Sequence, residues 1–183
     1  MHIVVLTGSP HKQGATALLA DKFIDGATRA DNTVFRFDAA FEKVHPCIGC
    51  DTCQGGANPC VFQDDMQRLY PELKKADMVV FVSPLYYHSM TSQLRMVIDR
   101  FHGIDKNLVG SKKRTMLFMA GASVVPTVFD GAIKTYRETA KYFGWQDFGV
   151  FPCFHCKTRE DIERTNCPAE AFKMGRILVD GPR

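Results

Sequence analysis

Short apolar runs alternate with longer segments of helical periodicity along most of the chain. Residues 2–6, 78–82 and 115–120 form runs dominated by valine, isoleucine, leucine, methionine and phenylalanine. Runs of this length predict strands that are buried on both faces of a parallel sheet. Residues 32–37 alternate in polarity and predict a further strand, and residues 147–152 predict a fifth.

Apolar positions at intervals of three and four residues predict the helices between these strands. The predicted helices cover about residues 15–29, 91–102, 128–143 and 168–179, and another is capped by Asp64-Asp65 and runs to about Lys75. Pro71 lies within this last helix, so its sequence allows a kink or an earlier end. Residues 38–63 are rich in cysteine, glycine and proline and are predicted to form a loop.

Strands that alternate with helices predict an α/β fold with a parallel sheet that is covered on both faces. The 183 residues, with 45% hydrophobic and 23% charged side chains, are typical of a globular protein, and we expect one domain over residues 1–183. The net charge of +3 and the lack of a basic run give no indication of nucleic-acid or membrane-surface binding. Because no apolar stretch approaches about 18 residues and a strand starts directly after Met1, we expect neither a spanning helix nor a signal peptide, and a cytoplasmic location.

The loop after the first strand carries the strongest functional signal. It reads Gly8-Ser9-Pro10-His11-Lys12-Gln13-Gly14-Ala15-Thr16 and leads directly into a helix. Backbone N–H groups at a helix N-terminus, together with serine and threonine hydroxyls, favour binding of a phosphate. A Walker loop is excluded because the two glycines are one residue too far apart and Ala15 stands at the lysine position, and no G-x-G-x-x-G pattern is present. A hydroxyl-rich loop of this kind suits a terminal phosphomonoester, such as the phosphate of FMN.

This loop resembles the G-S-P-R-x-x-G-N-T loop of the flavodoxin-like NAD(P)H-dependent FMN reductase family. A second motif after the third strand, Ser83-Pro84-Leu85-Tyr86-Tyr87, strengthens the resemblance, which covers roughly residues 2–145. The chain departs from the family pattern at His11, where arginine is usual, and at Ala15, where asparagine is usual. The resemblance implies a flavodoxin-like three-layer sandwich with a five-stranded parallel sheet in the order 2-1-3-4-5. It also implies an FMN cofactor, NAD(P)H as co-substrate and a homodimer.

The resemblance also implies which residues bind FMN. The phosphate would contact the first loop and the isoalloxazine ring would lie against the second, with Tyr87 where many relatives carry tryptophan. The predicted cofactor-binding residues are Ser9, His11, Gln13, Gly14, Ala15, Thr16, Pro84, Leu85, Tyr86, Tyr87, His88 and Gly121. No residue is predicted to be catalytic, because flavin and nicotinamide carry out hydride transfer themselves.

Four residues near these loops receive specific expectations. His88 is expected to form hydrogen bonds within its loop and not to act as a proton donor. Arg95 and Arg100, on the helix that follows, are expected on a solvated or subunit-facing surface. Around Gly121, either a backbone N–H approaches the flavin or the loop simply ends the strand.

Four of the seven cysteines, Cys47, Cys50, Cys53 and Cys60, follow the pattern C-x2-C-x2-C-x6-C. This spacing is compatible with ligation of a [4Fe–4S] cluster and resembles the compact motif of iron–sulfur flavoproteins, a branch of the same superfamily. Zinc is an alternative metal for these cysteines. A third alternative is that they bind no metal, since similar cysteines occur in members of the FMN reductase family. The other three cysteines, Cys153, Cys156 and Cys167, are expected to be buried or incidental thiols.

These observations support three functional hypotheses. The first is an FMN-dependent oxidoreductase that takes hydride from NAD(P)H and passes electrons to a small-molecule or protein acceptor, such as a quinone or a nitro compound. The second is an electron carrier in which an iron–sulfur cluster at the four clustered cysteines exchanges electrons with FMN. The third is a non-catalytic metal-binding or regulatory protein with the same fold.

Overall fold

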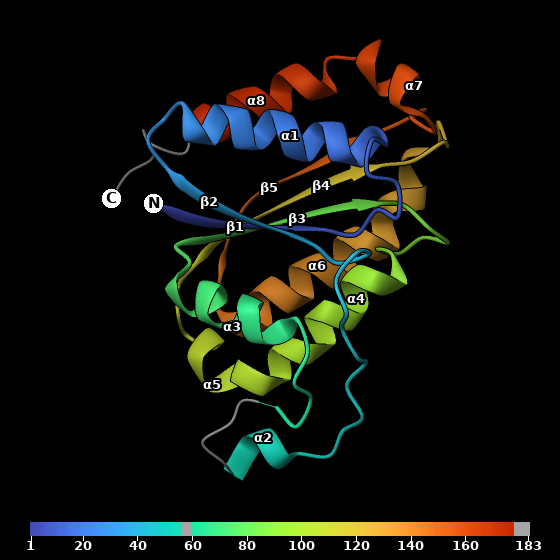
Figure 1. Cartoon of the computed structure of the whole chain (residues 1–183). Helices are drawn as coiled ribbons and strands as arrows, with labels where there is room; N and C mark the ends of the chain where they lie inside the picture. Colours follow the sequence, from blue (N-terminus) through green and yellow to red (C-terminus); the bar gives the residue numbers. More distant parts are fainter. Residues whose placement is uncertain (56–59, 178–183) are drawn as a thin grey trace.

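The computed structural model describes residues 1–55 and 60–177. Its five strands form one parallel sheet in the order β2-β1-β3-β4-β5, which is the order that the resemblance implies (Figure 1). The strands are β1 (His2–Thr7), β2 (Thr33–Asp38), β3 (Met78–Pro84), β4 (Arg114–Ala120) and β5 (Gln146–Cys153). β1 pairs with β2 and with β3, so the strand that leads into the phosphate-type loop lies inside the sheet.

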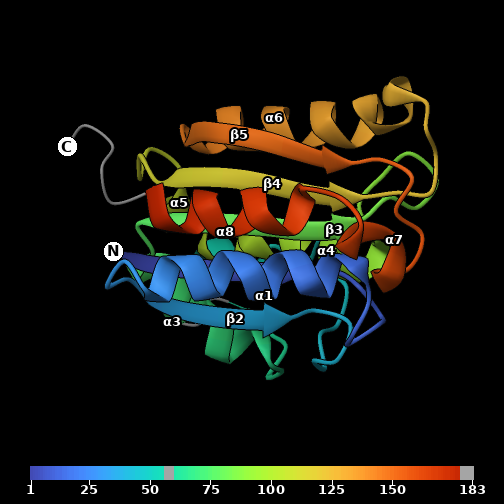
Figure 2. The ribbon, with the colours of Figure 1, turned by 90° about the horizontal axis from the view of Figure 1, so that it is seen from above.

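Helices cover both faces of this sheet (Figures 1 and 2). On one face lie α1 (Ala15–Thr28), α7 (Arg159–Glu163) and α8 (Cys167–Ile177); on the other lie α3 (Met66–Lys75), α4 (Ser92–Asp99), α5 (Asp105–Leu108) and α6 (Asp130–Phe143). Alternate residues of a strand point to opposite faces. Val4 and Leu6 of β1 accordingly enter one apolar core, while Ile3 and Val5 enter the other. None of the described helices combines the length and the apolar composition needed to cross a membrane.

Several element boundaries differ from the sequence-based expectation. The helix predicted over residues 91–102 is α-helical only to Asp99 and continues as a 3-10 helix over Arg100–Ile104. The segment predicted to be a loop contains one helical turn, α2 (Thr52–Gly55), and a 3-10 turn at Pro126–Phe129 precedes α6. α3 (Met66–Lys75) continues through Pro71 to the predicted end, so the helix does not end early at the proline. The last predicted helix begins one residue early and is described to Ile177, so residues 178–179 of that prediction lie outside the described residues.

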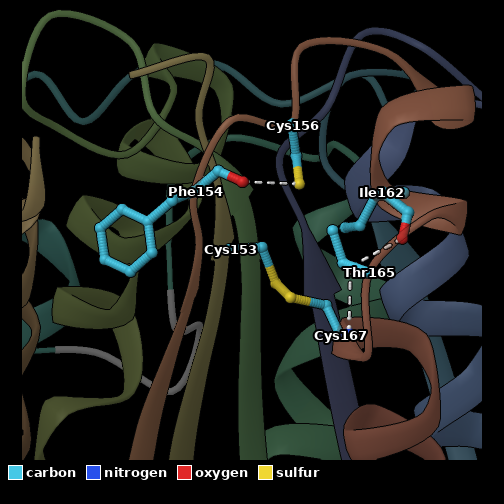
Figure 3. The surroundings of a disulfide bond; sticks show 6 residues. All are labelled: Cys153, Phe154, Cys156, Ile162, Thr165 and Cys167. Carbon is cyan, nitrogen blue, oxygen red and sulfur yellow. Dashed lines mark hydrogen bonds between the residues drawn. A yellow bond between two sulfur atoms is a disulfide. The ribbon is translucent and has the colours of Figure 1, made fainter. Parts of the chain in front are cut away.

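A disulfide joins the end of β5 to the start of α8, which corrects the expectation of incidental thiols for two of the three late cysteines. Figure 3 shows the bond between Cys153 and Cys167, with Cys156 nearby. Cys156 stays a buried free thiol, as expected, and its Sγ donates to the carbonyl oxygen of Phe154 at 3.0 Å. The disulfide therefore ties α8 to the edge of the sheet at which the strands end.

Arg100 is buried, contrary to the expectation that it lies on the surface. Its side chain is 1% exposed and forms a two-pronged ion pair with the equally buried Asp64, with Nη1 2.7 Å from Oδ2 and Nη2 3.2 Å from Oδ1. Arg95, one turn earlier, keeps the expected solvent-facing position and pairs with Asp99. A charged residue at a helix end is normally solvated, so the burial of Arg100 calls for a specific role.

We predict that Gly175→Ala lowers stability because α1 and α8 cross at glycines. A Cβ atom on Gly175 would lie 2.2 Å from the backbone oxygen of Phe23, and one on Gly26 would lie 2.1 Å from that of Phe172. Forcing the two helices apart should reduce the free energy of unfolding by about 1–3 kcal/mol, measured by urea denaturation. Gly55→Ala is the matched control, because no atom lies within 4 Å of its added Cβ. Equal stability of the two variants would contradict the close crossing.

Candidate functional site

Loops after β1, β3, β4 and β5 enclose a cavity of about 260 Å³. The carboxyl ends of parallel strands share one edge of a sheet, which brings these loops together although they are far apart in the chain (Figure 2). The cavity is lined by Ser9, His11, Gly14, Ala15, Thr16, Pro84, Leu85, Tyr86, Ala120, Gly121, Ala122, Cys156 and Lys157. The strand order reverses between β1 and β3, and in folds of this type ligands bind at the carboxyl ends of the strands at this point.

Nine of the predicted cofactor-binding residues line this cavity and three do not. The three outside the lining are Gln13, Tyr87 and His88. Gln13 is exposed, and Tyr87 is fully exposed beside the cavity residue Tyr86. The ring Nδ1 of His88 lies 3.1 Å from the carbonyl oxygen of Val128, so this histidine contacts the segment before α6 and not its own loop.

The loop after β1 is folded so that the first turn of α1 faces the cavity without a competing anion. The Ser9 Oγ accepts a hydrogen bond from the His11 N–H at 3.1 Å, and the Gly14 N–H donates to the His11 carbonyl at 3.1 Å. Gly14 is the N-cap of α1, no side chain caps the helix, and its first turn carries no acidic residue. The first N–H groups of a helix lack partners within the helix, so they are available to an anion in the cavity.

Thr91, the N-cap of α4, connects this loop to the loop after β3. Its hydroxyl donates to the Gly8 carbonyl at 2.8 Å and accepts from the Leu94 N–H at 3.4 Å. Its own N–H donates to Ser83 Oγ at 3.0 Å. Only glycine allows this approach at position 8, because a Cβ there would lie 2.3 Å from Thr91 Oγ1.

The loop after β3 ends in a strained two-residue turn. Tyr86 and Ser89 exchange two backbone hydrogen bonds of 3.0 Å, and between them Tyr87 and His88 have φ angles of 46° and 62°. Two successive positive φ angles are typical of a type I′ turn, where asparagine and glycine are preferred. Bulky residues rarely adopt this conformation, and the cases that occur cluster at ligand-binding and active sites. The turn places Tyr86 in the cavity lining and leaves the adjacent Tyr87 side chain fully exposed.

The loop between β5 and α7 supplies two cavity residues that the sequence-based prediction missed, Cys156 and Lys157. The Cys156 N–H donates to the Gly121 carbonyl at 2.8 Å, while the Gly121 N–H donates to the Cys153 carbonyl at 3.0 Å. Gly121 therefore has no free N–H for a ligand, and its lack of a side chain serves close packing, since a Cβ would lie 3.0 Å from Phe129 Cζ. Lys157 adds a cation to the cavity whose first loop has His11 in place of arginine.

The thiol of Cys156 is shielded from solvent at the cavity wall. Burial raises the pKa of Cys156, and the nearby Asp161 carboxylate acts in the same direction. The thiol is therefore protonated at neutral pH, and protonated thiols are poor nucleophiles. Cys156 serves as an apolar wall of the cavity and not as a reactive group.

The four clustered cysteines surround a second, smaller void of about 20 Å³ beside the 3-10 helix that follows α4. All four are free thiols; Cys47 and Cys50 are exposed, and Cys53 and Cys60 are half-buried. In the described part of the chain, no three His, Cys, Asp or Glu side chains converge closely enough to hold one metal ion. A four-iron cluster binds each thiolate to a different iron, so it holds its ligands farther apart than a single ion does.

The charges of these thiols influence one another. Burial raises the pKa of Cys53, and negative charge at Cys60 and Cys50 raises it further. Hydrogen bonding by the Thr52 hydroxyl lowers the pKa of the exposed Cys50. Zinc and iron–sulfur clusters both bind four cysteine side chains as thiolates. The chemistry of the donor set therefore fits a thiolate-ligated metal centre.

Comparison with known proteins identifies a matching family model and several curated relatives. The model of the family described as NADPH-dependent FMN reductase matches residues 1–153. An iron–sulfur flavoprotein of Methanocaldococcus jannaschii is 29% identical over 55% of this chain and 51% of the relative, and one of Archaeoglobus fulgidus is 30% identical over 66% and 56%. The chain spans about half the length of the curated relatives it matches.

Two solved structures share the fold along almost their whole length. The NAD(P)H:quinone oxidoreductase from Methanothermobacter marburgensis superposes with a TM-score of 0.77 at 14% identity, covering 100% of this chain and 98% of the other. An FMN-dependent NADH-azoreductase from Bacillus anthracis, solved in complex with FMN, gives a TM-score of 0.72 at 14% identity, covering 97% and 99%. At this level of identity the likeness shows the fold.

We predict that Tyr87→Asn stabilises the ligand-free protein. Asparagine tolerates the left-handed conformation better than tyrosine, and the exposed ring contributes little packing, so the free energy of unfolding should rise by about 1 kcal/mol. Tyr142→Asn is the control, because this exposed tyrosine lies in α6, where asparagine is the poorer residue. Thermal unfolding of both variants measures the difference. A loss of stability in Tyr87→Asn would show that the turn is not strained.

Proposed function

Because the chain belongs to the NADPH-dependent FMN reductase family, we propose that it is an FMN-dependent NAD(P)H oxidoreductase. The observation that carries this proposal is the single cavity in which the phosphate-type loop after β1 faces the aromatic loop after β3. When bound there, FMN supplies the hydride chemistry, taking electrons from NAD(P)H and passing them to an acceptor. The acceptor we propose is a quinone, a nitro compound or a redox protein, and we propose a homodimer as the working form.

In this proposal the polar half of the cavity binds the phosphate. The hydroxyls of Ser9 and Thr16 and the first N–H groups of α1 donate to its oxygens, and Lys157 contributes positive charge. His11 replaces the arginine of the family loop, and Ala15 contributes only its backbone. Binding is therefore distributed over hydrogen bonds instead of depending on one guanidinium.

The other half of the cavity binds the flat ring. Pro84, Leu85 and Tyr86 provide apolar surface, and the close packing at Gly121 leaves a wall without a protruding side chain. The N–H groups of Leu85 and Tyr86 already donate to Ala120 and Ser89 at 2.8 and 3.0 Å, so these two residues contribute ring contact and not backbone donors. The exposed Tyr87, adjacent to Tyr86, is suited to contact an aromatic acceptor as it approaches.

We further propose that the four clustered cysteines hold an iron–sulfur cluster that exchanges electrons with FMN. The supporting observation is that all four line one void, and the curated relatives carry the name iron–sulfur flavoprotein. Cys47, Cys50, Cys53 and Cys60 would each bind one iron. Zinc at the same thiolates, and a non-catalytic role of the chain, are the alternatives that experiment separates.

We predict that the double variant Ser9→Ala/Thr16→Ala binds FMN more than about 100-fold more weakly. The variant removes two hydroxyl donors, and a hydrogen bond to a charged phosphate contributes about 1.5–3 kcal/mol. Quenching of flavin fluorescence during titration measures the dissociation constant. Thr135→Ala is the control, because this hydroxyl bonds the Gly131 carbonyl on the exposed surface of α6. Unchanged affinity in the double variant would rule out the phosphate assignment.

We predict that protein purified without oxygen shows flavin absorption above a broad iron–sulfur absorption and contains iron. Replacing all four clustered cysteines with serine should abolish the iron and the broad absorption while FMN content stays the same, because the two cavities share no lining residue. Absorption spectra with iron, zinc and flavin analysis test this. Flavin without iron would support the FMN oxidoreductase and contradict the iron–sulfur cluster. Zinc in place of iron would support the zinc alternative. A colourless protein that takes up no FMN would refute both proposals.

A further inference from the structure

Arg100 carries a buried hydrogen-bond donor that no described residue satisfies. Its two terminal nitrogens are occupied: Nη1 donates to Asp64 and, at 2.7 Å, to the His45 carbonyl, and Nη2 donates to Asp64. Its Nε is buried and has no partner among the described residues. Buried polar groups are almost always hydrogen-bonded, so an unpaired N–H on a side chain only 1% exposed points to a missing acceptor.

Arg100 lines the same void as the four clustered cysteines. The lining of the void also includes Phe62. The Arg100 guanidinium lies over the Phe62 ring at 5.2 Å. Burial opposes the charged form, yet the hydrogen bond with Asp64 and the negative charge of that carboxylate raise the pKa of Arg100 above its ordinary value. The side chain is thus a permanent cation beside the candidate ligands.

The surrounding contacts hold the guanidinium in place independently of Nε. Asp64 accepts from the backbone N–H groups of His45 and Met66 at 2.9 and 3.1 Å, which fixes its carboxylate in front of Nη1 and Nη2. Although burial acts against ionisation, these hydrogen bonds together with Arg100 lower the pKa of Asp64. Nη1 and Nη2 therefore form the ion pair with Asp64, and Nε takes no part in it.

We propose that the Nε–H of Arg100 donates a hydrogen bond to a sulfur atom of the iron–sulfur cluster held by Cys47, Cys50, Cys53 and Cys60. This inference rests on the cluster assigned under the proposed function. Arg100 is then a positioning residue that also sets the reduction potential. When the cluster accepts one electron from reduced FMN it becomes one charge more negative, and a nearby N–H donor with positive charge stabilises the reduced form more than the oxidised form.

The test is the variant Arg100→Lys, which keeps a cation for Asp64 and removes the Nε donor. We expect it to retain iron and to show a lower reduction potential, with the ratio of reduced to oxidised cluster falling about tenfold at a fixed potential, which is about 59 mV for a one-electron couple. Redox titration followed by electron paramagnetic resonance measures this ratio. Arg95→Lys is the matched control: it lies on the same helical segment, pairs with Asp99 and does not line the void. A purely structural Arg100 would alter thermal stability without moving the potential.

A second measurement does not depend on whether Arg100→Lys folds. Wild-type protein labelled with ¹⁵N at arginine should show ¹⁵N hyperfine coupling in the electron paramagnetic resonance of its reduced cluster, because the donor nitrogen lies next to a cluster sulfur. Absence of this coupling, or an unchanged potential in an iron-loaded Arg100→Lys variant, overturns the inference and leaves the cluster in place. Wild-type protein that neither contains iron nor takes it up on reconstitution overturns the cluster and the inference together.

Discussion

The hydroxyl of Thr91 is the contact on which the candidate FMN site most depends. It bonds the Gly8 carbonyl, caps α4 through the Leu94 N–H, and belongs to a residue whose own N–H is bonded to Ser83. The loop after β1 and the loop after β3 are thereby fixed to the same helix end, although Gly8 and Thr91 are 83 positions apart in the chain. A side chain at position 8 would break this arrangement, so the glycine of the loop is required by packing before any ligand is considered.

The same helix connects the two candidate sites. Thr91 precedes the first residue of α4 and is bonded to the FMN-site loops, and Arg100 follows its last residue and lines the cysteine void. A helix rises about 1.5 Å per residue, so the backbones of these two residues are about 14 Å apart along its axis. α4 is therefore a rigid spacer that sets the distance between the two cavities within one chain. Its apolar residues Leu94, Val97 and Ile98 are buried in the core, which fixes its position.

Much of this arrangement could be predicted from the chain itself, and the exceptions have physical reasons. The strands were predictable because strands buried on both faces must be apolar throughout, and nine cavity residues were predictable because the loops after the first and third strands resemble those of a known family. Arg100 was not, because a charged residue on a helix reads as solvent-facing until its buried partner Asp64 is known. Lys157 and the Cys153–Cys167 disulfide were missed because only the fold brings the β5–α7 loop beside the first loop and α8 beside β5.

Three departures from ordinary local structure lie at the two candidate sites. α1 begins without a side-chain cap, Tyr87 and His88 occupy a turn that favours asparagine and glycine, and the buried Nε of Arg100 has no acceptor among the residues that the structure describes. Each feature is unfavourable in the protein alone, and such features persist in stable proteins mainly where function requires them. Each also implies a definite chemistry: an anion at the first turn of α1, a flat ring at the tyrosine turn, and an anionic sulfur acceptor at Arg100. The FMN that we propose would provide the first two, and the iron–sulfur cluster that we propose would provide the third, so the two proposals rest on different features of the structure.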